Sequence, residues 1–318
     1  MTDKIFEPAG IEQHQELPIL GLPKPSGPSL TSPALSRLNE IVLTALGGVQ
    51  RDWLRGIEQQ KPVGEAGDDF SNRAAERLDH MELRRQLNIE ALLQRAVRNL
   101  PERIEDGVID PDWAARFFTA VADVSDSTLA RLWARLLVME VRRVGAVPPL
   151  VLHRLPMLSK EVLSLFHRFA AFAVNNFVVR LATEFFEARD ITADNILLME
   201  EYGLVRTNRD LNRVFSSQLK ERFSTNLLYT DKALRVTHED PDKTLTLGCY
   251  RLTEFGTALS RALLEEGEIR SDTEYLVELV RTIQKQGFQV SQADILERED
   301  EQIVSKHTRF CELVVLGR

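Results

Sequence analysis

Five basic side chains gather in one predicted loop of the sequence, where two acidic residues only partly offset them, leaving a charge of +3. Arginine and lysine pair with phosphate and carboxylate groups. We therefore expect this loop to contact nucleic acid or a protein partner. The residues concerned are Arg206, Arg209, Arg213, Lys220 and Arg222.

Glu140 is the carboxylate that acid/base catalysis would use, because it follows Trp133 by two helical turns and shares its helix face. No second acidic group stands near it in a recognisable catalytic arrangement. We expect an ion pair instead, with Arg116, Arg135 or Arg143 as the partner.

Other catalytic and metal-binding patterns are missing from the sequence. The six histidines are scattered, and the two cysteines, Cys249 and Cys311, exclude a disulfide framework and a cysteine zinc cluster. There is no Gly-x-Ser-x-Gly elbow, phosphate-binding loop or dinucleotide fingerprint. Capping at helix starts accounts for Asp110, Asp112, Asp123 and Asp126 without a metal. We expect no catalytic residue, no cofactor and no metal, and hence no enzyme; a hydrolase or nuclease with a site assembled from distant residues is the remaining alternative.

Four aromatic residues at helical spacing, Trp113, Phe117, Phe118 and Trp133, are compatible with a ligand pocket. Aromatic side chains at such spacing more often supply core contact area. We therefore predict that they belong to the core.

Composition and charge narrow the class of protein. With 318 residues, 43% hydrophobic, the chain suits one large or two modest domains. The net charge of −8 counts against a protein that coats nucleic acid, although residues 264–301 alone contribute −7. The N-terminus lacks the apolar core of a signal peptide, and polar residues interrupt the most apolar stretch, 162–182. We expect a cytoplasmic protein with no transmembrane segment.

The elements that must position these residues indicate a mainly α fold: a helical bundle, then a winged-helix-like α+β domain, then a small C-terminal α/β extension. Proline and glycine positions and helical periodicity set the boundaries. We predict a disordered Pro-rich tail over 1–33, an amphipathic helix and linker over 34–71, the helical bundle over 72–182, the winged-helix-like domain over 183–264, and the acidic extension over 265–318.

The winged-helix prediction rests on a local order of helix, Gly-Leu-Val, hairpin and helix after residue 191. Strands over 234–237 and 244–252 would form the hairpin, whose wing adds Lys232, Arg235 and Lys243. DNA binding follows as an alternative function. The helix in the recognition position carries Asp194, Glu200 and Glu201, which would repel phosphate, so nucleic acid is not the favoured partner.

A family resemblance covers about residues 72–264. It is carried by Arg84–Glu90, Asp112-Trp113, Arg116-Phe117-Phe118, Val124-Ser125-Asp126, Leu132–Leu137 and Glu140-Val141, then by Gly203–Val205 and Leu252–Gly256. The chain resembles a bacterial domain-of-unknown-function family akin to abortive-infection alpha proteins. The resemblance implies a link to phage defence. We therefore expect a non-enzymatic interaction, sensor or adaptor protein of an anti-phage system, which recognises a phage component or recruits an effector protein, and which can form homo-oligomers.

Overall fold

The computed structural model describes residues 42, 48, 68–101, 104–217, 219–265, 269–298 and 304–313 of the chain. Two compact units divide it, Met1–Leu83 and Arg84–Arg318. The predicted Pro-rich tail lies outside the described residues, as does most of the predicted amphipathic helix and linker. The remaining predicted domain boundaries stay a prediction.

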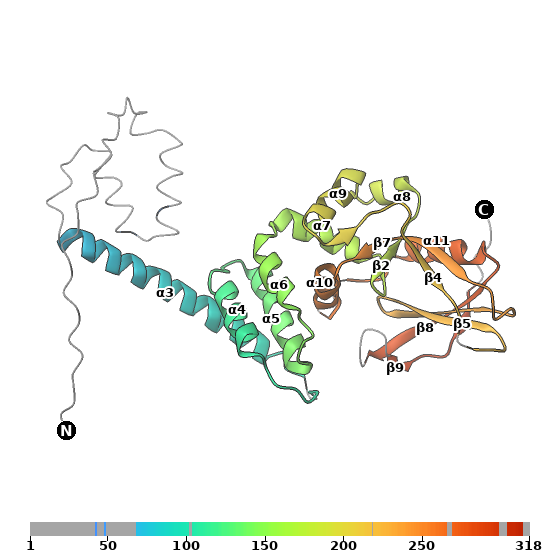
Figure 1. Cartoon of the computed structure of the whole chain (residues 1–318), viewed down its shortest axis with the longest axis horizontal. Coiled ribbons are helices and arrows are strands. Elements are labelled where there is room, and N and C mark those ends of the chain that lie inside the picture. Colours follow the sequence, from blue (N-terminus) through green and yellow to red (C-terminus); the bar gives the residue numbers. More distant parts are fainter. Residues whose placement is uncertain are drawn as a thin grey trace, which may run out of the picture. The chain divides into compact units, whose positions relative to one another are not determined.

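Helices occupy the first half of the described chain and recur within the second (Figure 1). Side-chain caps at Asp110, Asp126, Ser159, Thr192 and Asp272 satisfy backbone N–H groups at the starts of five of them. The helices are α3 Asp68–Val97, α4 Pro111–Ala122, α5 Ser127–Arg142, α6 Pro149–Arg154, the 3₁₀ turn η1 Leu155–Met157, α7 Lys160–Ala170, α8 Thr183–Glu187, α9 Ala193–Glu201, α10 Glu254–Glu265 and α11 Thr273–Gln284.

A ten-stranded sheet, antiparallel at every described pairing, makes the fold mixed α+β, so the mainly α prediction is wrong. Its order is β10-β8-β6-β5-β1-β2-β7-β3, with β4 also paired to β7 and β9 to β8. The strands are β1 Ala173–Val174, β2 Phe177–Val179, β3 Val205–Arg206, β4 Asn212–Phe215, β5 Phe223–Tyr229, β6 Lys232–His238, β7 Leu245–Leu252, β8 Gln289–Arg298, β9 Val304–His307 and β10 Cys311–Glu312.

The winged-helix prediction fails because β6 and β7, the two strands of its hairpin, do not pair with each other. β6 lies between β5 and β8, and β7 lies between β2 on one side and β3 and β4 on the other. The true hairpin joins β5 to β6 through Thr230, whose φ is 45°. The C-terminal strands belong to the same sheet, so the predicted separate α/β extension is wrong as well.

The most apolar stretch of the sequence, 162–182, is helical only in its first part. α7 stops at Ala170, and the next residues form the hairpin of β1 and β2, in which Val174 pairs with Phe177. The turn between them begins at Asn175 with φ 54°, a conformation that asparagine tolerates better than most residues. The hairpin places β2 between β1 and β7 in the sheet.

One hydrophobic core runs through the unit from Arg84 to Arg318. It joins aromatic residues of the helical part, such as Phe117 and Trp133, to sheet residues such as Phe177 and Leu247. α10 contacts α5, α6, α7 and β7, so it links the helices to the sheet. The helical part and the sheet therefore share one core, and the outer strands β3 and β4 are joined to that core through their pairing with β7.

Candidate functional site: an arginine-lined sheet edge

The junction of β3 and β7 places two arginines opposite each other. Val205 pairs with Leu252 and Arg206 pairs with Arg251, so the side chains of the two arginines leave the same face of the sheet. Both are exposed to solvent. The Gly-Leu-Val and Leu-Thr-x-x-Gly segments noted in the sequence are the residues that build this junction.

Close backbone packing fixes the junction. Thr253 donates its backbone N–H to the carbonyl oxygen of Leu204 at 3.0 Å and its hydroxyl to that of Gly203 at 2.5 Å. Gly203 has φ 70°, where residues other than glycine are strained. A Cβ on Gly256 would lie 2.1 Å from the Leu204 carbonyl oxygen, so only glycine allows α10 to start this close to β3.

The loop between β3 and β4 is braced from behind. Arg180 donates hydrogen bonds to the carbonyl oxygens of Arg209 at 2.7 Å, Asn208 at 2.9 Å and Cys249 at 3.1 Å. The carboxylate of Glu200 accepts the backbone N–H of Thr207 at 2.9 Å and its hydroxyl as well. These hydrogen bonds therefore fix the conformation of the loop. The carboxylate of Glu200 is occupied by its hydrogen bonds to Thr207.

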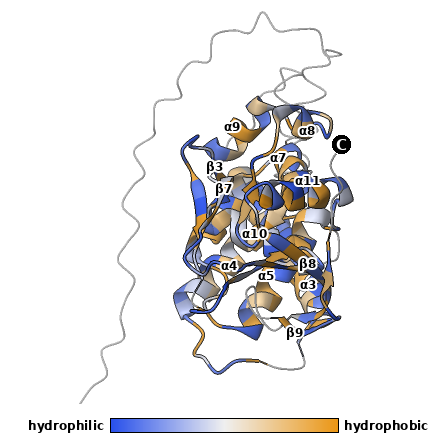
Figure 2. Cartoon of the chain, turned by 90° about the vertical axis from the view of Figure 1, so that its right-hand side faces the viewer, coloured by the Kyte–Doolittle hydropathy of each residue, from blue (hydrophilic) through white to orange (hydrophobic). Residues whose placement is uncertain are grey.

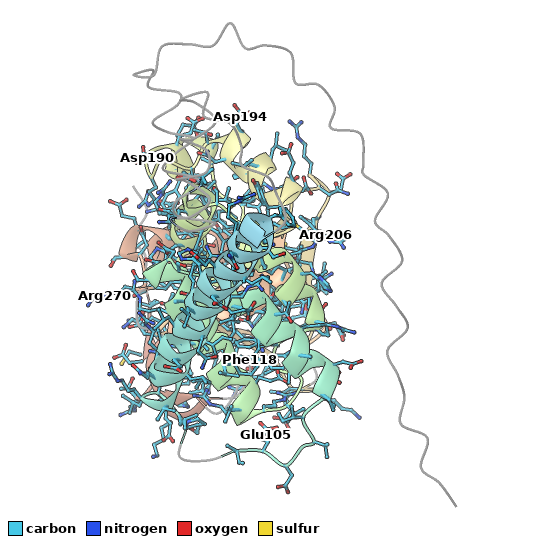
Figure 3. All side chains as sticks on the ribbon, turned by 90° about the vertical axis from the view of Figure 1, so that its left-hand side faces the viewer. Glu105, Phe118, Asp190, Asp194, Arg206 and Arg270 are labelled. Atoms are coloured by element: carbon cyan, nitrogen blue, oxygen red, sulfur yellow. The ribbon has the colours of Figure 1, made fainter. Side chains whose placement is uncertain are left out.

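We define the arginine edge as Arg206, Arg209, Arg213 and Arg251. All four side chains are exposed, and none forms an ion pair with any residue that the structure describes. β3 and β7 lie together at one side of the view in Figure 2, and Figure 3 shows Arg206 at the rim of the molecule. The guanidinium of Arg213 lies over the ring of Phe215, 5.7 Å from its centroid.

Cys249, a buried residue of β7, lies close to the arginine edge in the sheet. Burial raises its pKa, and the charges of Arg180, Arg213 and Arg251 act against that rise. Cys249 and Arg251 lie on one face of β7, and Arg213 lies on the same face of β4 opposite Leu247, although Arg213 and Arg251 are 38 positions apart in the sequence. Together with the register, this groups the edge into one positively charged surface.

Holding like charges together costs stability. Directly opposed like charges on neighbouring strands are destabilising, and on helices such pairs cost about as much as opposite charges gain, which across strands is roughly 0.2–1 kcal/mol. The pairing of Arg206 with Arg251 brings no compensating carboxylate within ion-pair distance among the described residues. A surface kept at such a cost is suited to bind an anionic group from outside the chain.

Three of the five predicted contact residues, Arg206, Arg209 and Arg213, lie on β3, β4 and the loop that joins these strands. Lys220 and Arg222 are exposed in the segment after β4, and no described contact joins them to the arginine edge. Sequence reasoning missed Arg251 because its neighbour Arg206 lies far away in the chain. The missed signal was the end of β7, Arg251-Leu252, which pairs with Val205-Arg206 of β3.

The basic residues of the predicted wing are engaged elsewhere in the sheet. Lys232 forms ion pairs with Asp294 at 2.6 Å and Asp231 at 3.0 Å. The guanidinium of Arg235 stacks 3.9 Å from the ring centroid of Phe310. Lys243 lies over the ring of Phe288, 5.0 Å from its centroid. These residues add no charge to the arginine edge, because β5, β1 and β2 separate β6 from β7.

Glu140 is a structural residue. Its buried carboxylate accepts backbone N–H groups from Gly145 at 2.7 Å and Val147 at 2.9 Å, and no described ion pair joins it to an arginine. The indole N–H of Trp113 donates to the Val147 carbonyl oxygen at 2.8 Å. The expected ion pair is therefore wrong, and Glu140 instead holds the turn after α5.

The acidic residues at helix ends also have structural roles. Asp110 and Asp126 cap α4 and α5 as predicted, whereas Asp123 ends α4 and pairs with Arg84 at 3.0 Å and Arg85 at 3.2 Å. Across the part of the chain that the structure describes, no three His, Cys, Asp or Glu side chains converge as a metal site would require. Trp113, Phe117 and Trp133 are buried, which confirms their predicted place in the core.

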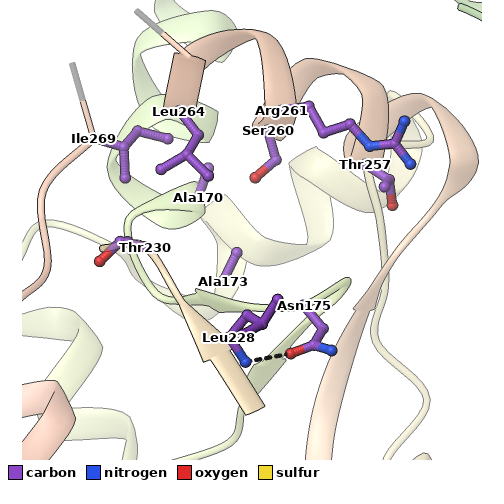
Figure 4. A pocket seen from close by; sticks show the side chains of 10 residues that line it. All are labelled: Ala170, Ala173, Asn175, Leu228, Thr230, Thr257, Ser260, Arg261, Leu264 and Ile269. Carbon is purple, nitrogen blue, oxygen red and sulfur yellow. Dashed lines mark hydrogen bonds between the residues drawn. The ribbon is translucent and has the colours of Figure 1, made fainter. Parts of the chain in front are cut away.

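A small cavity lies beside α10 (Figure 4). Its volume of about 40 Å³ suits a few water molecules, whereas pockets for organic ligands measure roughly 300 Å³ or more. The side chain of Asn175 accepts the backbone N–H of Leu228 at 2.8 Å at its wall. The arginine edge is therefore the stronger candidate site.

Comparison with known proteins gives one family. Residues 72–183, about a third of the chain, are similar to a protein family of unknown function, DUF2806. No curated protein and no solved structure matches the chain. The matched region runs from α3 to the end of the β1–β2 hairpin and stops before the arginine edge. No helix among the described residues combines the length and hydropathy that crossing a bilayer requires.

Proposed function

We propose that this chain is a non-enzymatic interaction protein that binds an acidic protein partner through the arginine edge. The observation that carries the proposal is the direct pairing of Arg206 with Arg251, two exposed like charges on a braced edge. Arginine fits this task because its planar guanidinium binds a carboxylate through two parallel hydrogen bonds.

The proposed setting is an anti-phage defence system of the bacterial cytoplasm. The resemblance of Arg84–Val141 to abortive-infection alpha proteins supports this setting. In that setting the partner is an acidic phage component or an acidic effector protein, and the chain acts as a sensor or adaptor. A protein partner is favoured over nucleic acid because Val214, next to Arg213 on β4, exposes an apolar side chain against which a side chain of a protein can pack.

The proposal is tested by comparing the wild-type chain with Arg206→Glu/Arg251→Glu in infected cells. Both proteins are expressed with their neighbouring genes, challenged with a panel of phages, and purified with whatever co-elutes. Arg222→Glu is the control, because it makes one substitution of the same kind, arginine to glutamate, outside the arginine edge.

We expect the double variant to lose both plaque reduction and one acidic co-eluting protein, with Arg222→Glu behaving like wild type. Equal plaquing for all three proteins, with the same co-eluting proteins, would overturn the proposed function. Co-elution of nucleic acid alone, removed by the double substitution, would overturn the choice of a protein partner.

A further inference from the structure

β4 is an edge strand with an open side. Its residues pair with β7 alone among the described strands. Cys249 donates its backbone N–H to the Leu211 carbonyl oxygen at 3.0 Å, which sets the phase of the hydrogen bonds along this pair. Because such positions alternate, Arg213 and Phe215 direct their backbone groups to β7, and Asn212 and Val214 direct theirs outward.

The side chains of β4 present two different faces at this open side. Arg213 and Phe215 lie on one face, and Asn212 and Val214 lie on the other, with Val214 58% exposed. A strand that paired with the outer side of β4 would meet positive charge on one face and an exposed apolar group on the other. An extended segment that alternates acidic and apolar residues complements both faces.

We infer that the partner binds as an extended acidic segment that adds a strand to the outer side of β4. This inference rests on the proposed function, because it names how the arginine edge holds its partner. Backbone hydrogen bonds to Asn212 and Val214 supply the docking, and carboxylates on Arg213, Arg206 and Arg251 supply the selectivity for an acidic sequence.

Protection of an exposed edge is the alternative reason for charges on β4, since proteins place charged residues on edge strands to prevent aggregation. Edge protection needs no opposed pair of like charges and no braced loop. The strands at the other end of the sheet show the contrast, because there Lys306 of β9 pairs with Glu297 of β8 at 2.7 Å. The four arginines of the arginine edge have no ion-paired carboxylate among the described residues, which suits a partner that supplies one.

Two probes test the inference on the full-length chain. One is the heptapeptide Glu-Val-Glu-Val-Glu-Val-Glu, and the other is the same peptide with alternate backbone nitrogens methylated, in both possible registers. Poly-glutamate and a single-stranded oligonucleotide report charge-driven binding that needs no strand. Val214→Pro removes an outward N–H without touching a hydrogen bond to β7, and Val214→Thr is its control.

We expect the heptapeptide to bind wild type and Val214→Thr equally, with at least tenfold weaker binding to Val214→Pro. One methylated register should lose at least tenfold as well. Amide hydrogen exchange should slow at Asn212 and Val214 in the complex, with circular dichroism showing that both variants are folded.

Equal binding of the methylated peptides and of Val214→Pro, combined with loss in Arg206→Glu/Arg251→Glu, would overturn strand addition and leave the proposed function standing. Binding of poly-glutamate but not of the heptapeptide would also overturn strand addition and leave the proposed function standing. If wild type binds neither acidic probe, both proposals are wrong. If the oligonucleotide binds more tightly than the heptapeptide, and Val214→Pro does not change its affinity, strand addition is also overturned.

Discussion

Replacing Arg251 by glutamate should stabilise the protein while removing its proposed binding function. The change turns the like-charged pair of Arg206 and Arg251 into an opposite-charged pair on directly opposed positions. Repulsion of roughly 0.2–1 kcal/mol is lost and an attraction of similar size is gained, so unfolding should cost about 0.4–2 kcal/mol more. For a unit of this size, each kcal/mol raises Tm by about 2–4 °C.

Chemical denaturation of four proteins measures the effect: wild type, Arg251→Glu, Arg206→Glu and the double variant. Each single variant should gain stability, and the double variant should lose that gain, because two carboxylates then face each other. Arg251→Gln, which keeps a polar side chain without the charge, should recover only the part due to lost repulsion. The gain should shrink at about 1 M salt, where the screening length is about 3 Å.

The outcome that refutes this reasoning is a loss of stability. If Arg251→Glu and Arg251→Gln both destabilise the fold by more than about 0.5 kcal/mol, the arginine makes a structural contribution. The pairing of Arg206 with Arg251 would then not destabilise the fold, and it would give no reason, on grounds of stability, to expect an anionic partner. Arg222→Glu is the control for a general effect of net charge, and its stability should stay within about 0.5 kcal/mol of wild type.

Three further substitutions test the scaffold by urea denaturation. Glu140→Gln should cost about 1–3 kcal/mol, because a buried N–H loses its carboxylate acceptor; a loss below 0.5 would contradict this role. Gly256→Ala should cost about 1–3 kcal/mol and weaken acidic-peptide binding, because its Cβ meets the Leu204 carbonyl; unchanged Tm and affinity would contradict the packing. Burial opposes ionisation of Asp272, yet Arg189 outweighs it and lowers the pKa of that carboxyl. Asp272→Asn should therefore cost about 1–3 kcal/mol at pH 7, with the difference from wild type fading as pH falls below about 4; a pH-independent difference would contradict it.

Local signals in the sequence predict the helices well. Asp110-Pro111, Ser159 and Thr192 mark helix starts that the structure contains, and Gly203 ends α9 with φ 70°. These signals work because capping and chain reversal depend on a few neighbouring residues. Fold class could not be read the same way, because it depends on which strands pair.

The winged-helix prediction was wrong because it assumed that two strands close together in the sequence pair with each other. β6 and β7 follow one another in the chain and look like a hairpin, yet β6 pairs with β8 across more than fifty residues. The same non-local pairing hid Arg251, whose position beside Arg206 exists only in the folded sheet. Charge composition did predict Arg206, Arg209 and Arg213 as a group, because they lie close together in the sequence.

The central claim is that the arginine edge binds an acidic partner, and its most direct measurement is a salt titration of heptapeptide affinity by fluorescence anisotropy. We expect micromolar-range binding by wild type that weakens steadily with salt, at least tenfold weaker binding by Arg206→Glu/Arg251→Glu, and no change in Arg222→Glu. Affinity that is the same in all three proteins, or that does not respond to salt, would contradict the claim.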